Sequence, residues 1–273
     1  MKRLLDNLGG VLLGALMVMA VIFLLLPIVI SMGMAFDSRT YLGAFPPPDV
    51  SLQWFERFFS DDYFLRGLRT SIVLAVIVTF ISTAIGTSSA VAIDRYEFKG
   101  KSALTAFFLA PLVVPGVVIG FALLMFLALL DIEGGFARLV AGHVIITVPY
   151  TVRTTLAGLV GIRRTLIEAA LSLGATERQA FREITFPLAR TGIIAGAIFA
   201  FAFSMDDVVV SIFLSDPQTY TLPVALISMM RANFDLTIAA AAVMLIAMSV
   251  VLILALDRAI GLDKVIGQGI YRS

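Results

Sequence analysis

The sequence predicts an all-α membrane protein with six transmembrane helices in a single domain over residues 1–273. Of the 273 residues, 60% are hydrophobic and 14% are charged, whereas about a quarter of the residues in a soluble domain are charged. The mean hydropathy is +1.01. Several runs without Asp, Glu, Lys or Arg are long enough to cross a hydrocarbon core about 30 Å thick as a helix. We therefore expect membrane lipid to surround most of the chain.

Four uncharged runs and two weaker ones give the expected spans. The uncharged runs are residues 11–34, 70–93, 102–130 and 236–256. The weaker spans are residues 139–162, interrupted by Arg153, and residues 191–214, interrupted by Asp206 and Asp207. The first run follows Lys2 and Arg3. We expect it to be retained, because it is too long for the core of a signal peptide and shows no small-x-small cleavage site.

The distribution of Lys and Arg predicts the orientation, because cytoplasmic loops are enriched in these residues. Most of the 20 such residues lie near the termini and in the loops after the second and fourth spans. They are Lys2, Arg3, Arg95, Lys99, Lys101, Arg163, Arg164, Arg178, Arg182, Arg190, Arg258, Lys264 and Arg272. We therefore expect both termini, and the loop over about residues 163–190, to be cytoplasmic.

The longest segment expected on the opposite side covers residues 36–69. Its Pro46-Pro47-Pro48 run should be extended. Ser51 could then cap an amphipathic helix whose apolar side chains are Trp54, Phe55, Phe58, Phe59, Phe64 and Leu65. Aromatic side chains there are typical of membrane-interface anchors. Trp54 is also a candidate for the substrate pathway.

Two features predict how the third and fifth spans are built. Pro111 and Pro115 should kink the third span and free backbone carbonyls, which is tolerated where neighbours or a cavity satisfy them. Small residues four apart suit close helix crossings, and they occur as Gly116 with Gly120 and as Gly192 with Gly196. We expect these two spans to pack tightly.

The cytoplasmic loop predicts two short helices joined at Gly174. Thr165 and Glu168 fit a capping box for the first helix, and Thr176 and Gln179 fit one for the second. Gly174 suits the left-handed stop of the first helix. The second should end near Thr185, because a proline follows two residues later. Capping alone leaves an alternative open, in which the loop is an ordinary surface hairpin.

The residues Glu168, Ala169, Ala170, Gly174, Ile184 and Pro187 have the spacing Glu-Ala-Ala-x3-Gly-x9-Ile-x-x-Pro. This pattern resembles the signature of membrane permease subunits of ABC importers, with a mild departure at Phe186, where many members have Leu. The resemblance implies a type I importer permease fold (MetI-like) in a bacterial inner membrane. It implies that the loop carries a coupling helix that docks on a cytoplasmic ATPase.

The same resemblance implies the partners. They are a second homologous permease, two copies of the ABC ATPase and a periplasmic substrate-binding protein. ATP and Mg would be bound by the ATPase, so this chain would need no cofactor and would not be an enzyme.

Other classes of function find little support in the sequence. There is no Cys and only one His, which argues against thiol chemistry and a metal site. The net charge of +1 gives no reason to expect nucleic acid. A secondary transporter would show repeated halves and a channel a filter-like segment, and neither pattern is found.

The fifth span contains Ser204, Asp206 and Asp207, which are candidates for the substrate pathway. A carboxylate within a spanning helix usually faces a cavity or a partner. Adjacent residues of a helix point about 100° apart, so both carboxylates cannot face one narrow path equally. The alternative is that the helix breaks near Met205 and the pair caps the segment that follows.

The run Ser204-Met205-Asp206-Asp207 is similar to the second permease of spermidine/putrescine importers, which usually has Leu at the second position. That resemblance implies a cargo such as putrescine or spermidine. An opine, aminoethylphosphonate or another small nitrogenous compound is the alternative. In the fourth span, we expect His143 to be an interfacial polar residue. Arg153 either extends to the cytoplasmic side or pairs with an aspartate of the fifth span.

Overall fold

The computed structural model describes residues 2–232 and 234–260. Over these residues the regular secondary structure is helical, apart from one isolated bridge between Asp37 and Val50. The α-helices are α1 (Lys2–Ala35), α2 (Gln53–Ser60), α3 (Asp62–Arg95), α4 (Lys101–Leu109), α5 (Gly116–Leu129), α6 (Gly135–Leu159), α7 (Arg164–Ser172), α8 (Glu177–Ala180), α9 (Phe186–Asp206), α10 (Val209–Leu214), α11 (Leu222–Ala232) and α12 (Thr237–Ile260). A 3-10 turn, η1 (Ala110–Leu112), and a π-helical turn, η2 (Phe181–Thr185), complete the set.

The backbone contacts group the chain into two compact units. Unit 1 joins Met1–Asp62 to Leu226–Met248, and unit 2 joins Tyr63–Ala225 to Ser249–Ser273. The single domain expected over residues 1–273 stays a prediction. Lys264 and Arg272, which contribute to the expected cytoplasmic C-terminus, lie outside the described residues.

Unit 1 is held together around Trp54. Its side chain is 3% exposed and packs with Met34 and Ala35 of α1 and Ala240 of α12. The indole Nε1–H donates to the Asp37 backbone oxygen at 2.8 Å. Trp54 is therefore a core residue of unit 1, and the expectation that it anchors at the membrane interface is wrong. The predicted amphipathic helix is also shorter than expected, since α2 ends at Ser60.

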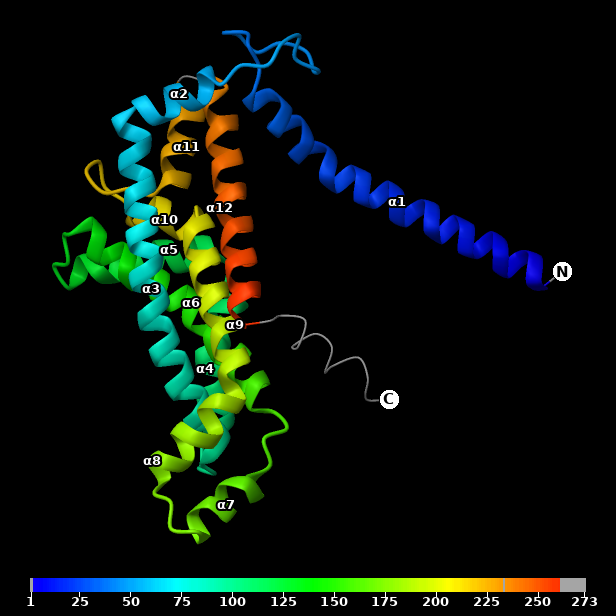
Figure 1. Cartoon of the computed structure of the whole chain (residues 1–273). Helices are drawn as coiled ribbons and strands as arrows, with labels where there is room; N and C mark the ends of the chain where they lie inside the picture. The colour runs from blue at the N-terminus through cyan, green and yellow to red at the C-terminus, as the bar shows by residue number, and fades with distance from the viewer. Residues whose placement is uncertain (1, 233, 261–273) are drawn as a thin grey trace. The chain divides into compact units, whose positions relative to one another are not determined.

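Unit 2 contains long helices that run side by side, among them α3, α6 and α9 (Figure 1). Buried hydroxyls connect α3 to α6, where Ser82 Oγ and Thr147 Oγ1 are 2.7 Å apart. Around them lies an apolar core that includes Leu74, Val78 and Leu139. These contacts hold α6 at the centre of the unit.

The small residues of the fifth span bring α9 onto the α6 backbone. A Cβ atom at Gly192 would lie 2.5 Å from the Thr154 backbone oxygen, and one at Gly196 would lie 2.9 Å from the Thr151 Cα. The prediction that Gly192 and Gly196 pack against the third span is therefore wrong. The predicted packing of the third span on the fifth is confirmed at Gly120, where a Cβ would lie 3.2 Å from the Cα of Val210 in α10.

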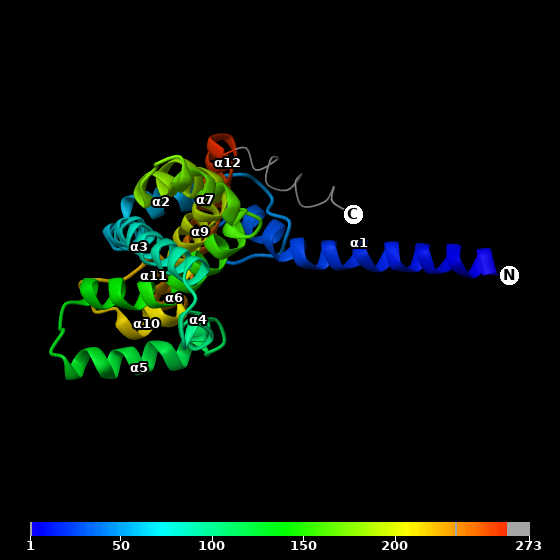
Figure 2. The same ribbon diagram turned by 90° about the horizontal axis from the view of Figure 1, so that it is seen from below.

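The expected spans are only partly continuous helices. Among the described residues, four helices are long and apolar enough to cross a membrane, and a fifth counts if the bent pair Lys101–Leu112 and Gly116–Leu129 forms one span. The sixth expected span corresponds to α12. The bent pair turns by 102° at Pro115 (Figure 2), so the third span is broken rather than kinked.

The second helix of the loop over about residues 163–190 does not end at Thr185, which corrects the prediction. It continues through Pro187 into α9, so that Glu177–Asp206 is one span of 30 residues. A proline inside an α-helix removes one hydrogen bond and clashes with the carbonyl four residues earlier. The wider turn η2 ends at Thr185, directly before α9, and accommodates Pro187 as the second residue of that helix.

We predict that Gly192→Ala destabilises unit 2, because the added methyl group meets Thr154 and Gly158 backbone atoms that cannot rotate away. Overpacking of this kind costs about 1–3 kcal/mol. The measurement is the thermal unfolding midpoint of the purified protein in detergent. Gly134→Ala is the matched control, since nothing lies within 4 Å of a Cβ there. Equal midpoints for the two variants would contradict the close crossing.

Candidate functional site

The loop over about residues 163–190 presents α7 as an exposed helix with a defined stop. Gly174 adopts φ +87°, as predicted. Its N–H donates to Leu171 O and the Ala175 N–H donates to Ala170 O, both at 3.0 Å. This pair of bonds is a Schellman motif, which satisfies the last carbonyls of a helix. Glycine is favoured at this stop because other residues rarely adopt a left-handed backbone.

The two predicted capping boxes have different outcomes. Thr176 and Gln179 form theirs, with the Gln179 N–H donating to Thr176 Oγ1 at 3.3 Å and the Thr176 N–H donating to Gln179 Oε1 at 2.7 Å. The box expected from Thr165 is not formed. The helix starts one residue earlier, at Arg164, and has no side-chain cap. The expectation that Glu168 caps α7 is therefore wrong, and its exposed carboxylate is available to a partner.

The structure distributes the residues of the Glu-Ala-Ala pattern over two elements. Glu168, Ala169 and Ala170 lie on α7 and Gly174 at its stop, whereas Ile184 lies in η2 and Pro187 in the first turn of α9. The face around them carries apolar side chains, with Leu173 89% exposed and Leu166 47% exposed. An exposed, partly apolar helix of this kind is typical of a surface that a partner covers.

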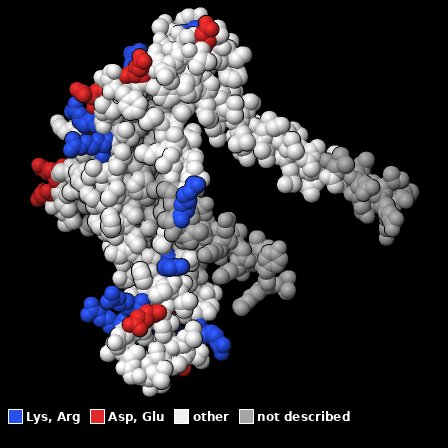
Figure 3. All heavy atoms as spheres, in the orientation of Figure 1, with Lys and Arg blue, Asp and Glu red and all other residues white. Residues whose placement is uncertain are grey.

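A hydrogen bond and an ion pair connect this loop to the end of α3. Arg164 donates to the Asp94 backbone oxygen at 3.1 Å, and Arg95 pairs with Glu177 at 3.3 Å. Glu97 receives a bond from Lys101 at 2.9 Å, which holds the pKa of the Glu97 carboxyl below its usual value. Charged side chains gather at the end of unit 2 that carries α7 and α8 (Figure 3).

The second site lies where the fifth span breaks. Helix α9 ends at Asp206, and Asp207 is extended. The Asp207 Oδ2 atom accepts the N–H groups of Val210 at 3.1 Å and of Ser211 at 2.9 Å. Asp207 therefore satisfies the first turn of α10, as in the capping alternative. Asp206 is exposed, so the two carboxylates face different surroundings.

A histidine that the sequence did not single out for this site lies beside the break. His143 is fully buried in α6, so the expectation that it is an interfacial residue is wrong. Its Nδ1 lies 2.8 Å from Ser204 Oγ and its Nε2 lies 2.9 Å from Ser211 Oγ. The Asp207 carboxylate is 3.8 Å from Nε2. The polar residues of the fifth span were the sequence signal for this site. Nothing in them indicated which residue of the fourth span faces them.

Of the remaining candidates, Ser204 belongs to this cluster and Arg153 does not. Ser204 is 1% exposed and bonded to His143, so it supports the site rather than lining a path. Arg153 is exposed on α6, and the ion pairs found among the described residues do not join it to Asp206 or Asp207.

A small cavity of about 190 Å³ is lined in part by Asp207. Tyr150 of α6 and Phe203 of α9 also line it, with ring centroids 5.0 Å apart. Pro111 and Gly116 border it from the broken third span. The cavity thus combines a carboxylate with aromatic rings, which together suit an organic cation.

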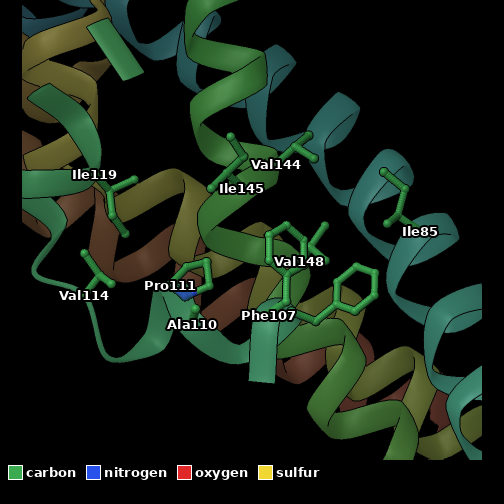
Figure 4. Close-up of a pocket in the computed structure, with 10 residues that line it drawn as sticks. Ile85, Phe107, Ala110, Pro111, Val114, Ile119, Val144, Ile145 and Val148 are labelled. Carbon is green, nitrogen blue, oxygen red and sulfur yellow. The ribbon is translucent and has the colours of Figure 1, made fainter. Parts of the chain in front are cut away.

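A larger cavity of about 400 Å³ lies against the same bend and is lined by apolar side chains. Pro111 and Val114 of the bend line both cavities. In the larger one they lie with Val144, Ile145 and Val148 of α6, as Figure 4 shows. The break of the third span therefore borders both the carboxylate and a surface of apolar character.

Comparison with known proteins identifies the family. Residues 82–262 match the family of binding-protein-dependent transport system inner membrane components. The chain belongs to this family. It is 32% identical over 260 residues to the spermidine/putrescine transport system permease protein PotC of Escherichia coli (strain K12), covering 95% of this chain and 97% of that protein. It is 31% identical over 203 residues to the putrescine transport system permease protein PotI of the same strain, covering 72% of each.

Solved structures confirm the predicted fold of a type I importer permease. A chain of a bacterial ABC transporter involved in the import of the acidic polysaccharide alginate superposes with a TM-score of 0.73 at 16% identity, over 100% of both chains. A chain of a methionine ABC transporter in inward-facing conformations superposes with a TM-score of 0.59 at 18% identity, over 72% of this chain and 94% of the other.

We predict that Gly174→Ala loosens the end of α7, because a side chain in the left-handed region costs about 1–2 kcal/mol. Asparagine tolerates this region better, so Gly174→Asn should loosen it less. The measurement is hydrogen exchange of the Gly174 and Ala175 amides, which the stop motif protects. Faster exchange in the Asn variant than in the Ala variant would contradict this interpretation of the motif.

Proposed function

We propose that this chain is a permease subunit of an ATP-driven importer of small polyamines such as putrescine and spermidine. The observation that supports this choice of cargo is the cavity at the break of α9, where Asp207 lies with Tyr150 and Phe203. A polyamine carries several positive charges separated by methylene groups. It needs an anionic partner for an ammonium group and tolerates apolar walls along its methylene groups, and the cavity offers Asp207 and apolar walls.

The relatives support the same cargo. Proteins named for spermidine and putrescine transport align with most of this chain. A molybdate/tungstate transport system permease protein of Thermococcus kodakarensis is 29% identical but covers 54% of this chain. A carboxylate on the path would repel such oxyanions, so Asp207 favours the cationic cargo.

We assign Asp207 to the path and Asp206 to a second contact beside it. The Oδ2 atom of Asp207 is bound to the start of α10, whereas Oδ1 has a long contact of 3.5 Å to the Val210 N–H. One oxygen therefore holds the carboxylate in place and the other is available to an ammonium group. Asp206 is exposed in the described chain and could receive a second ammonium group of the same molecule. Trp54 and Ser204 do not stay in the proposed path, because both are buried in their own units.

The proposed partners follow the family's domain roles. A second homologous permease would complete the path, two copies of a cytoplasmic ATPase would bind and hydrolyse ATP with Mg, and a periplasmic binding protein would deliver the cargo. In this arrangement α7 docks on the ATPase and both termini lie in the cytoplasm. The chain itself hydrolyses no nucleotide, and the binding protein supplies most of the selectivity.

We predict that Asp207→Asn lowers ATP-dependent uptake of labelled putrescine and spermidine about tenfold or more. A hydrogen bond to a charged group is worth about 1.5–3 kcal/mol, and the amide loses the charge. Asp206→Asn should lower uptake by a smaller factor. The measurement uses the complete complex in vesicles, with Asp131→Asn, in the loop after α5, as the matched control.

Each outcome of this assay has a separate meaning. If uptake is unchanged by Asp207→Asn, the cavity is not the path and the carboxylate only caps α10. If the wild-type complex takes up neither polyamine, the cargo is wrong and a related nitrogenous solute becomes the candidate.

We further predict that Glu168→Ala combined with Gly174→Pro uncouples ATP hydrolysis from uptake, because the exposed carboxylate and the stop of α7 are both lost. The measurement is the number of polyamine molecules taken up per ATP hydrolysed. Glu183→Ala is the control, since it removes an exposed carboxylate of the same loop outside the Glu-Ala-Ala pattern. Normal coupling in the double variant would show that α7 is not the docking element.

A further inference from the structure

The buried histidine of α6 has no role in the path proposed above, although it lies directly behind the Asp207 carboxylate. A chain of polar atoms connects the two. The Ser211 hydroxyl lies 3.1 Å from Asp207 Oδ2 and 2.9 Å from His143 Nε2. The other ring nitrogen lies 2.8 Å from the hydroxyl of Ser204. This series of hydrogen bonds thus starts at Ser204 in α9, passes through His143 of α6 and ends on the carboxylate at the start of α10.

The chemistry of the groups fixes the direction of these hydrogen bonds. A carboxylate only accepts, so the hydroxyl of Ser211 donates its hydrogen to Asp207. That hydroxyl oxygen then accepts from His143, which places the imidazole hydrogen on Nε2. In the neutral ring Nδ1 is left as an acceptor, and the Ser204 hydroxyl donates to it. Every polar atom of the chain is satisfied by this one arrangement.

We propose that His143 is a positioning residue for the passage of the cation, acting on Asp207 through Ser211. The inference rests on the proposed polyamine function. His143 does not line the cavity, whereas Asp207 does. By fixing the Ser211 hydroxyl, the ring holds a third donor on Oδ2 beside the two backbone N–H groups of α10, and this leaves Oδ1 for the cargo. Without the ring, the Ser211 hydroxyl is free to rotate away, and Oδ2 keeps only its two backbone donors.

Burial makes this arrangement sensitive to change. His143, Ser204 and Ser211 are each at most 1% exposed, so water cannot readily replace a lost partner. A buried polar group left without a hydrogen bond is costly. This series of hydrogen bonds therefore has one low-energy arrangement rather than several. A binding group with a fixed orientation in a transport path requires such an arrangement.

Two conservative replacements of His143 test its hydrogen bonds to Ser204 and to Ser211 separately. The amide nitrogen of Gln reaches about as far as Nε2 of His, so His143→Gln keeps a donor for Ser211. The shorter Asn reaches about as far as Nδ1, so His143→Asn keeps contact with Ser204 and loses Ser211. We expect His143→Asn to lower putrescine uptake by the complete complex about tenfold, the size expected for a disturbed bond to a charged group. We expect His143→Gln to stay within about threefold of wild type.

A double-mutant cycle distinguishes positioning from simple damage to packing. In an Asp207→Asn background, His143→Asn should change uptake by less than about twofold, because the group on which it acts is already altered. Thr155→Val is the matched control. It removes a buried hydroxyl of α6 that has no hydrogen-bond partner among the described residues, so it should leave uptake unchanged.

The outcomes decide the inference. Equal uptake in His143→Asn and wild type, equal losses in both backgrounds, or no rescue by Gln would each overturn it. No polyamine uptake by the wild-type complex would overturn the proposed function as well. If His143→Asn fails to assemble with the ATPase, Ser211→Ala takes its place, since it removes only the connecting hydroxyl. Uptake by Ser211→Ala should also fall about tenfold, and wild-type uptake there would overturn the inference.

Discussion

Within a bilayer the backbone has no water to bond with, so every N–H and C=O group needs a partner inside the protein. The rest of unit 2 depends on how this constraint is met where the fifth span breaks. Asp207 supplies acceptors for the first turn of α10, so a break in this helix is tolerated. The same carboxylate then lies beside a cavity. The group that makes the break possible is also the group that the cavity offers to a cation.

The close crossing of α9 and α6 places the break correctly. Gly192 and Gly196 bring the two backbones together, and this fixes the height of His143 against the end of α9. Helix α6 is fixed in turn by buried hydroxyl contacts with α3. Small residues therefore determine the distance between the helices, and buried hydroxyls determine their register.

The sequence predicted those features that depend on local chemistry. The apolar runs, the stop at Gly174 and the capping box at Thr176 follow from composition and from the preferences of single residues. The Glu-Ala-Ala pattern and the acidic pair are enough by themselves to indicate the family. Each of these signals lies within one continuous stretch of the sequence, where composition and spacing carry the information.

Features that depend on pairing between distant segments were missed. His143 and Ser211 are 68 residues apart, and no local pattern indicates that they meet. The sequence around Trp54 is typical of an interface anchor, and only its partners in α1 and α12 show that it is a core residue. Pro187 predicts a helix end because proline does not fit inside an ordinary α-helical turn. The helix continues here because the wider turn η2 precedes α9.

The widened turn at Phe181–Thr185 has a consequence for the phase of the whole span that follows. A π-helical turn holds one residue more than an α-helical turn, and each residue of a helix accounts for about 100° of rotation. Everything after the turn is therefore rotated by that angle relative to an uninterrupted helix. The side of α9 that meets α6, and with it the direction in which the aspartates emerge, is set by a single extra residue in η2. A chain lacking that residue would present the same helix with a different face to its neighbour.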